Sequence, residues 1–179
     1  LEAGLRWADA DSEVSLTLWR NKVRNLIGFG APGACLNTFG CYQNTGRARL
    51  EGATLAAHTQ LAGITLRGSL DWHDPRSLDT DKLLQRRARQ LATFSAETTL
   101  AGWTLGTELQ AAGKRYEDAA NTKAMGGYAL LNLFASKALS KELSLQARID
   151  NLGDNQYELA RHYATAGRNA QLTLRWTMP

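Results

Sequence analysis

The sequence predicts an all-β fold, an antiparallel transmembrane β-barrel, on three observations. Apolar and polar residues alternate with period two in many segments, most clearly in residues 170–178. Because successive side chains of a strand point to opposite faces, each such segment has one apolar and one polar surface. Short and long connections alternate along the chain, and tryptophans recur near segment ends. These features are typical of outer-membrane barrels, whose apolar face contacts lipid and whose polar face lines a wet interior.

The composition is compatible with this fold class and disfavours several others. Of the 179 residues, 44% are hydrophobic and 21% are charged, which argues against disorder. The net charge is +4, but the basic residues are spread along the chain, so nucleic acid is not expected as a partner. A run of about 18 apolar residues is absent, which excludes a transmembrane helix but not membrane-spanning strands. The segment from Leu1 lacks the features of a signal peptide, so we expect a piece of a longer protein that starts within a strand.

The first three strands are expected at residues 1–7, 14–28 and 45–59. The first has leucine, alanine and tryptophan on one face, and the second begins with the same alternation. Beyond Trp19 the alternation weakens, as expected where a strand leaves hydrocarbon and continues into water. The third strand is the least regular, because Gly52 interrupts it, which suggests either a bulge or close packing.

Three further strands are expected in the middle of the chain, at residues 64–73, 84–100 and 103–116. The first of them is the most regular segment of the sequence, with isoleucine, leucine and tryptophan alternating with threonine, arginine and serine. The second and third strands are separated by a minimal turn at Ala101–Gly102. We therefore predict a tight hairpin at this position.

The last three strands are expected at residues 127–136, 143–150 and 170–178. The first of these has leucine and phenylalanine on both faces, so its register stays open, with either face able to be the apolar one. The other two alternate cleanly. In the final strand Leu172, Leu174 and Trp176 share a face opposite Thr173 and Arg175.

The connections between these nine strands alternate in length. Short ones are expected at residues 8–13, 60–63, 101–102 and 139–142, and long ones at 29–44, 74–81, 117–125 and 151–167. Outer-membrane barrels show this pattern, with turns at the periplasmic rim and loops outside. Bacterial single-chain barrels have an even number of strands, and lipid does not tolerate an unpaired strand edge. We therefore expect the missing strands to lie upstream of Leu1.

A soluble β-sandwich or lipocalin-like barrel, with its apolar face turned inward, is the alternative. Three features count against it: long alternating segments, charged residues in mid-strand on the polar face, and tryptophans near strand ends on the apolar face. These tryptophans are Trp7, Trp72, Trp103 and Trp176. The barrel requires Leu66, Leu105, Leu145 and Leu172 to face lipid and Arg67, Glu108 and Arg148 to face the bore. A closed interior formed by these leucines would contradict it.

Two cysteines lie close together in the loop expected at residues 29–44. We predict a disulfide between Cys35 and Cys41, which would indicate an oxidising compartment, and two unpaired thiols are the alternative. A zinc site is not expected, because histidine is absent from this stretch.

The sequence lacks the features of an enzyme or of a resident metal site. Its three histidines (His58, His73 and His162) are scattered, and neither a nucleophile motif nor a phosphate-binding loop is present. The aspartates at positions 71, 74, 79 and 81 do not have the spacing of a calcium loop, which favours a solvated loop. We therefore expect no catalytic residues, no metal site and no cofactor.

Two motifs near the end of the chain resemble a known family. Asn151-Leu-Gly-Asp-Asn-Gln-Tyr157 resembles the N-L-F-D-x-x-Y signature that precedes the last strand of TonB-dependent outer-membrane receptors, with Gly153 in place of the usual phenylalanine. Ala166–Arg168 resembles the closing element of the same family. Within the family the chain is most similar to receptors for vitamin B12 (cobalamin), in the stretches 83–89, 114–116, 125–127 and 163–168.

The resemblance implies that residues 1–179 form the C-terminal portion of a 22-stranded barrel whose N-terminal plug domain and earlier strands are absent here. It further implies a monomeric receptor in outer-membrane lipid, which imports cobalamin when TonB pulls on a TonB box in the absent plug. Calcium-binding loops would also belong to the absent part. A siderophore receptor within the same family, or a passive porin-like barrel, is the alternative.

Four residues where strands enter the long loops are candidate ligand contacts by this resemblance: Arg87, Arg115, Tyr116 and Tyr163. Arginine and tyrosine hydrogen-bond amide and phosphate oxygens, and tyrosine adds apolar area against a corrin rim. The alternative is that Arg87 and Arg115 pair with bore carboxylates such as Glu108, or stabilise the plug.

Overall fold

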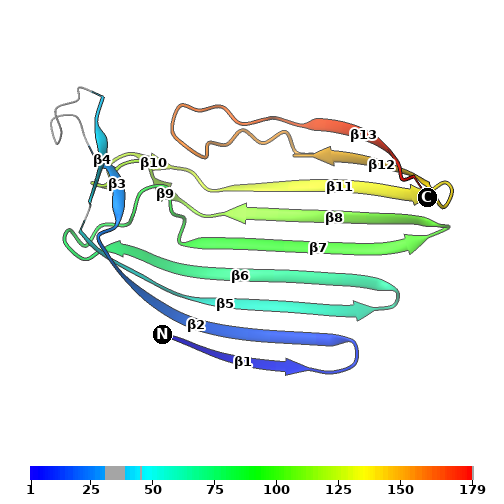
Figure 1. Ribbon diagram of the computed structural model, residues 1–179, viewed down its shortest axis with the longest axis horizontal. Helices are drawn as coiled ribbons and strands as arrows, with labels where there is room; N and C mark the ends of the chain where they lie inside the picture. Colours follow the sequence, from blue (N-terminus) through cyan, green and yellow to red (C-terminus); the bar gives the residue numbers. More distant parts are fainter. Residues whose placement is uncertain (31–38, 45, 179) are drawn as a thin grey trace.

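The computed structural model describes residues 1–30, 39–44 and 46–178, and within them the protein is built of antiparallel strands joined by turns and loops. Nine strands form one sheet in the order β1-β2-β5-β6-β7-β8-β11-β12-β13, so strands adjacent in this sheet follow one another along the chain (Figure 1). Two short pairs, β3-β4 and β9-β10, lie at the long-loop end. The described residues contain no helix of the length and apolarity needed to cross a membrane. The predicted all-β antiparallel meander is confirmed.

The strands of the main sheet are 7 to 15 residues long. In chain order they are β1 Glu2–Ala8, β2 Ser12–Arg24, β5 Arg47–Leu61, β6 Ile64–Ser77, β7 Gln90–Leu100, β8 Trp103–Ala112, β11 Tyr128–Ala138, β12 Leu143–Asp150 and β13 Asn169–Trp176. The short strands are β3 Ile27–Gly30, β4 Cys41–Asn44, β9 Arg115–Tyr116 and β10 Ala124–Met125.

The register places the apolar side chains of neighbouring strands on one face of the sheet, because directly opposite residues share a face. One such row across seven strands is Leu5, Leu16, Leu55, Leu70, Ala92, Ala111 and Ala129. Leu66, Leu105, Leu145 and Leu172 lie on the same face. Large apolar side chains here stay open to the surroundings, with Leu105 38% and Leu172 75% exposed. They do not gather into a closed interior, as the soluble alternative would require.

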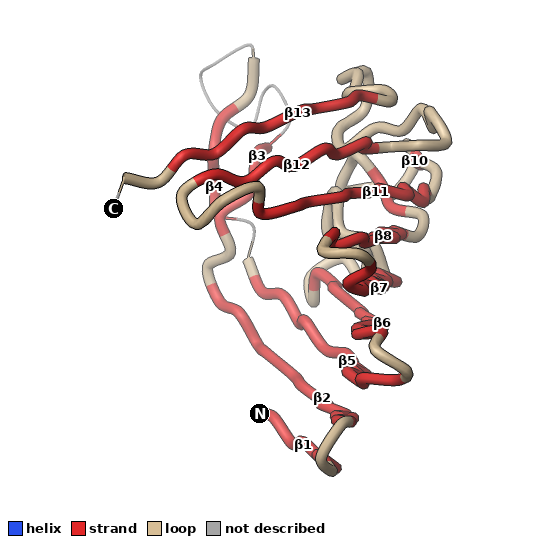
Figure 2. Tube along the Cα trace, turned by 90° about the vertical axis from the view of Figure 1, so that its right-hand side faces the viewer, coloured by secondary structure: helices blue, strands red, loops and turns tan. Residues whose placement is uncertain are grey.

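The opposite face is polar and concave. Figure 2 shows the strands following one another along an arc from β1 to β13. On its inner side a hollow of about 440 Å³ is lined by polar side chains from five successive strands of the sheet, among them Ser15, His58, Arg67, Thr93 and Glu108. Further along this face Glu108 of β8 pairs with Arg148 of β12 at 2.5 Å, across the intervening strand β11. The predicted orientation, apolar outside and charged residues inside, agrees with this geometry.

The turns at the short-connection end are tight. Ala62 and Gly63 both have positive φ, as do Ala101 and Gly102. Two consecutive left-handed residues give the type I′ turn, whose twist matches that of the strands it joins. The predicted minimal turn at Ala101–Gly102 is therefore confirmed, and the short connections lie at the end opposite the long ones (Figure 1).

Four predicted boundaries at the long-loop end were wrong. The second strand was expected to reach residue 28, but β2 ends at Arg24. Residues 84–89 are irregular and β7 begins at Gln90, while the strand predicted to reach Tyr116 ends at Ala112. Strand β6 instead continues through Pro75 to Ser77, although proline was assigned to a loop. The backbone of Pro75 points away from β5, since its carbonyl accepts a hydrogen bond of 2.8 Å from the Leu84 N–H. On that side the pairing of β6 with β7 stops at Trp72 and Gln90. Proline is tolerated there because the sheet needs no donor on that side.

The predicted loop at 29–44 is also partly strand, because residues 27–30 pair with residues 41–44 as β3 and β4. Cys41 opens β4, whereas Cys35 lies outside the described residues. The disulfide between Cys35 and Cys41 therefore stays a prediction.

Strand β5 passes Gly52 without a bulge, since its pairing with β2 and β6 keeps one register throughout. A Cβ atom at this position would lie 2.2 Å from the Trp72 carbonyl oxygen and 3.0 Å from the Trp19 ring. Of the two explanations for this glycine, close packing holds, because a Cβ atom here would collide with the backbone carbonyl of Trp72 on β6.

We predict that Gly52→Ala destabilises the protein by about 1–3 kcal/mol, since the backbone of β6 cannot yield without disturbing the ladder. Gly68→Ala is the matched control, because its Cβ would come no closer than 3.5 Å to another atom. Thermal unfolding of both variants, prepared as full-length protein in detergent, measures the difference. Equal unfolding temperatures would contradict the packing role.

Candidate ligand-binding site at the long-loop rim

A hollow of about 820 Å³ lies on the concave face at the long-loop end of the sheet. Its floor comes from the strands, and segments that follow β6, β8 and β12 close its upper side. The floor residues include Trp19, Asn21, Leu50, His73, Leu91 and Tyr128, and the upper residues are Arg86, Arg87, Ala88, Arg115 and Leu159. The hollow therefore combines aromatic and apolar surface with arginines above it.

The aromatic part of the floor was not identified from the sequence. Trp19 and His73 meet edge to face with ring centroids 5.4 Å apart, and His73 lies 3.8 Å from the Asp71 carboxylate. These residues sit at bore-facing positions of β2 and β6. The sequence position of Trp19 could have revealed this floor. Trp19 directly follows Leu18, so its side chain lies on the opposite, polar face of the strand.

Two of the four predicted contacts, Arg87 and Arg115, line this hollow. Arg87 is exposed at its upper side. Arg115 is only 4% exposed, and its guanidinium donates to the Glu158 carbonyl while lying 5.2 Å from the centre of the Tyr128 ring. Arg115 thus fastens the loop after β12 to the sheet, and its hydrogen-bonding capacity is partly used by the protein itself.

The other two predicted contacts lie elsewhere. Tyr116 alternates with Arg115 and lines a separate hollow on the outer face, where the Lys114 ammonium lies 5.1 Å from the centre of its ring. Tyr163 is 71% exposed in the loop after β12 and is not among the lining residues of the concave hollow. Glu108, the proposed alternative partner of the arginines, instead pairs with Arg148.

The asparagine signature folds the loop after β12 back onto the sheet. Asn151 is 4% exposed and has a φ of 52°; its N–H donates to the Asn132 side-chain oxygen at 2.9 Å, and its own side-chain oxygen accepts from the Asn155 N–H at 2.9 Å. The Asn155 amide in turn donates to the Ala129 carbonyl at 2.7 Å. Tyr157 then stacks on Tyr128 with ring centroids 4.5 Å apart. The signature residues therefore shape the wall of the hollow.

Charged groups join three loops above the hollow. The Glu117 carboxylate accepts hydrogen bonds from the Arg86 guanidinium and, at 3.0 Å, from the Arg161 N–H. The hydrogen bond from Arg86 holds the pKa of Glu117 below its ordinary value. At the neighbouring Asp118, burial opposes ionisation, but hydrogen bonds from Lys123 and Thr122 outweigh it and lower its pKa to about 2. Both carboxylates are therefore charged at neutral pH.

Three of the four aspartates considered for calcium are engaged with arginines, and the fourth, Asp71, accepts a hydrogen bond from the Thr54 hydroxyl. Asp74 lies 2.8 Å from Arg76, and Asp79 lies 3.1 Å from Arg47. Within the part of the chain that the structure describes, no group of three or more histidine, cysteine, aspartate or glutamate side chains could hold a metal ion. The end of β6 and the loop after it therefore form an arginine–carboxylate network.

Several solved structures share this fold. The copper transporter OprC superimposes with a TM-score of 0.80 at 16% identity, over 98% of this chain and 30% of its own. The siderophore receptor PiuA from Acinetobacter baumannii gives 0.74 at 23% identity, over 98% and 28%. BauA, the ferric preacinetobactin receptor from the same organism, gives 0.76 at 20% identity, over 98% and 28%. The chain therefore spans about 30% of the length of the chains it resembles.

The sequence also matches a family model over residues 1–152, described as TonB dependent receptor-like, beta-barrel. This match covers most of the chain, and it agrees with the outward apolar face, the alternating connections and the open antiparallel sheet. The family consists of transport receptors of the bacterial outer membrane rather than enzymes. The chain belongs to the β-barrel family of TonB-dependent receptors.

Proposed function

We propose that this chain is the C-terminal portion of the barrel of a receptor that imports cobalamin across the outer membrane. The observation that carries the proposal is the hollow on the concave face, which offers aromatic and apolar surface beside Arg87. Cobalamin is large and presents both an apolar corrin rim and amide and phosphate oxygens, which suit such a lining. Movement inward depends on TonB, acting through a plug domain that is not part of this chain.

A ferric siderophore is the second candidate cargo. It is favoured by the names of the solved structures, since PiuA is a siderophore receptor and BauA a ferric preacinetobactin receptor. Their identities with this chain are 23% and 20%, which supports a shared fold and leaves the cargo open. A passive pore is the third candidate, and it would require a parent protein without a plug domain.

Equilibrium binding of cyanocobalamin to the full-length protein tests the cargo. Arg87→Gln is expected to weaken binding about tenfold, because it removes a charged hydrogen-bond donor at the hollow. Arg67→Gln, an exposed arginine deeper on the same face, is the matched control and should leave binding unchanged. Failure to bind cyanocobalamin, together with tight binding of a ferric siderophore, would replace cobalamin by a siderophore as the cargo.

The orientation of the sheet can be tested with two neighbouring positions of β8. Leu109 is exposed on the apolar face and Gln110 is exposed on the concave face. We expect Leu109→Arg to reduce the free energy of unfolding in lipid bilayers by about 2–4 kcal/mol and Gln110→Arg to reduce it far less, because only the former places a charge in hydrocarbon. Urea unfolding in bilayers measures both, and the reverse order would refute the orientation.

The contact between the loops depends on ionised Glu117. Because its pKa is lowered, this contact is expected at all pH values above the ordinary carboxylate range, and it is lost as the pH falls through the lowered value. Glu117→Gln should reproduce the loss at neutral pH. Hydrogen exchange over residues 158–163 measures it, with Glu142→Gln in the turn at the opposite rim as control. Protection equal to that of the unmodified protein would show that Glu117 does not hold this loop.

A further inference from the structure

The apolar outer face ends abruptly toward the long loops and is replaced by arginine and lysine. On β2, Leu18 is the last apolar residue of this face, and every later residue of the strand on the same face is basic. On β6 the boundary follows Trp72. The basic side chains beyond it on three neighbouring strands are Arg20, Lys22, Arg24, Arg47, Arg49 and Arg76.

The register stacks these cations directly opposite one another. Lys22 faces Arg49 and Arg49 faces Arg76, so three positive charges form one row across β2, β5 and β6. Arg24 faces Arg47 in the next row. Like charges at directly opposed positions destabilise a sheet, so this arrangement requires negative charge nearby.

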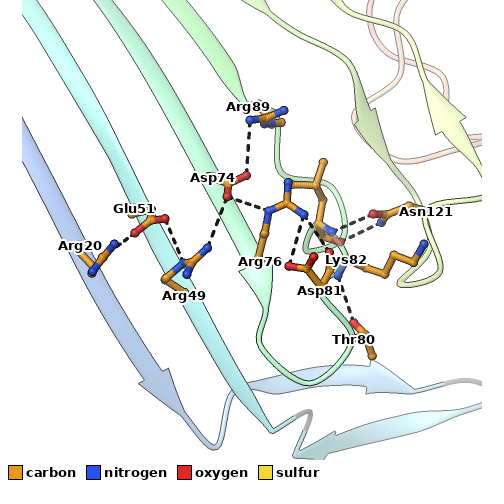
Figure 3. A network of polar contacts seen from close by, with 11 residues as sticks. Arg20, Arg49, Glu51, Asp74, Arg76, Thr80, Asp81, Lys82, Arg89 and Asn121 are labelled. Carbon is orange, nitrogen blue, oxygen red and sulfur yellow. Dashed lines mark hydrogen bonds and ion pairs between the residues drawn. The ribbon is translucent and has the colours of Figure 1, made fainter.

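Acidic side chains of the chain neutralise only part of this surface. Figure 3 shows the network: Glu51 binds Arg20 at 2.6 Å and Arg49 at 3.1 Å, and Asp74 binds Arg76 at 2.8 Å and Arg89 at 3.6 Å. Asp81 and Asp79 add contacts to Arg76 and Arg47. The exposed Lys22 and Arg24 are without an ion pair among the described residues. The two rows of cations on β2, β5 and β6 therefore carry uncompensated positive charge at Lys22 and Arg24.

A hollow of about 670 Å³ adjoins the network on the same outer face. Leu18, Ala53 and Trp72 form its apolar edge. Its polar side carries Arg89 and Lys114, together with the carboxylates of the network, Glu51 and Asp74, which are already paired with arginines. An amphiphile with acyl chains along the apolar face and an anionic headgroup beyond Trp72 matches both edges. A purely polar anion would match only one of them.

We propose that the outer face of β2, β5 and β6 beyond Leu18 and Trp72 binds the phosphate groups of an anionic lipid in the outer leaflet. The long loops of outer-membrane barrels lie outside the cell, which places these cations at the depth of the outer headgroups. Arginine and lysine at that depth attract lipid phosphates, and each adds about a fivefold factor to binding. The proposal concerns the lipid side of the barrel and does not depend on which cargo the receptor carries.

The test uses delipidated full-length protein in non-ionic detergent, titrated with diphosphoryl lipid A and followed by native mass spectrometry. We expect binding of the diphosphoryl lipid, and Lys22→Gln combined with Arg24→Gln should weaken it about 25-fold, because two unpaired cations are removed. Lys137→Gln combined with Lys141→Gln is the matched control at the opposite rim, and should change affinity less than twofold.

Three results would overturn the proposal. The first is equal affinity of the Lys22/Arg24 variant and the unmodified protein for the diphosphoryl lipid. The second is equal binding of lipid A from which the phosphates have been removed. The third is a dimer that the Lys22/Arg24 substitutions dissociate, which would assign the face to a second copy of the chain. If the Lys22/Arg24 variant fails to assemble, Arg89→Gln combined with Lys114→Gln repeats the test from the adjoining hollow, again with weakened lipid binding expected and unchanged binding contradicting the proposal.

Discussion

The structure depends on a continuous hydrogen-bonded ladder whose register places most of the large apolar side chains on one face. In lipid, a backbone group without a hydrogen-bond partner costs several kcal/mol, so strands can cross only when neighbours pair along their whole length. The register from β1 to β13 is continuous, with one offset in each strand pair. Because the side-chain period is two, that register also decides which residues meet hydrocarbon and which meet the bore. Gly52 illustrates this constraint, since β5 keeps its register at a position where only glycine fits.

The asparagine signature near the end of the chain has a structural role in this protein. Asn151 and Asn155 bond to the side chain and backbone of β11, and Tyr157 packs on Tyr128 of the same strand. A loop fixed in this way can hold Arg115 and the residues around Leu159 over the concave face. The signature therefore acts on the ligand site indirectly, by placing its wall beside Tyr128, while Trp19 and His73 of the floor come from β2 and β6.

The two ends of the barrel wall carry different chemistry on the outer face. Near the short turns, Trp7, Trp103 and Trp176 lie where an interfacial aromatic belt is expected, and Lys137 lies 5.4 Å from the centre of the Trp103 ring. Near the long loops, a single tryptophan, Trp72, borders the arginine–carboxylate network among the described residues of this face. This asymmetry gives the two rims of the sheet different surfaces for headgroups.

The sequence by itself determined the β-class, the strand order, the apolar face and the short turns, because a period of two and turn chemistry are local properties that survive without knowledge of contacts. Only the tertiary structure decided the register of β11, where leucines occupy both faces: Leu131 and Leu133 face outward because they oppose Leu109 and Thr107, while Leu130 becomes buried over the bore. It also decided that Arg115 is tied to the Glu158 carbonyl, that Tyr116 faces outward, and that Trp19 meets His73. Those contacts depend on which strands lie side by side and on how the loops fold over them. The alternation within a single strand does not determine such long-range contacts.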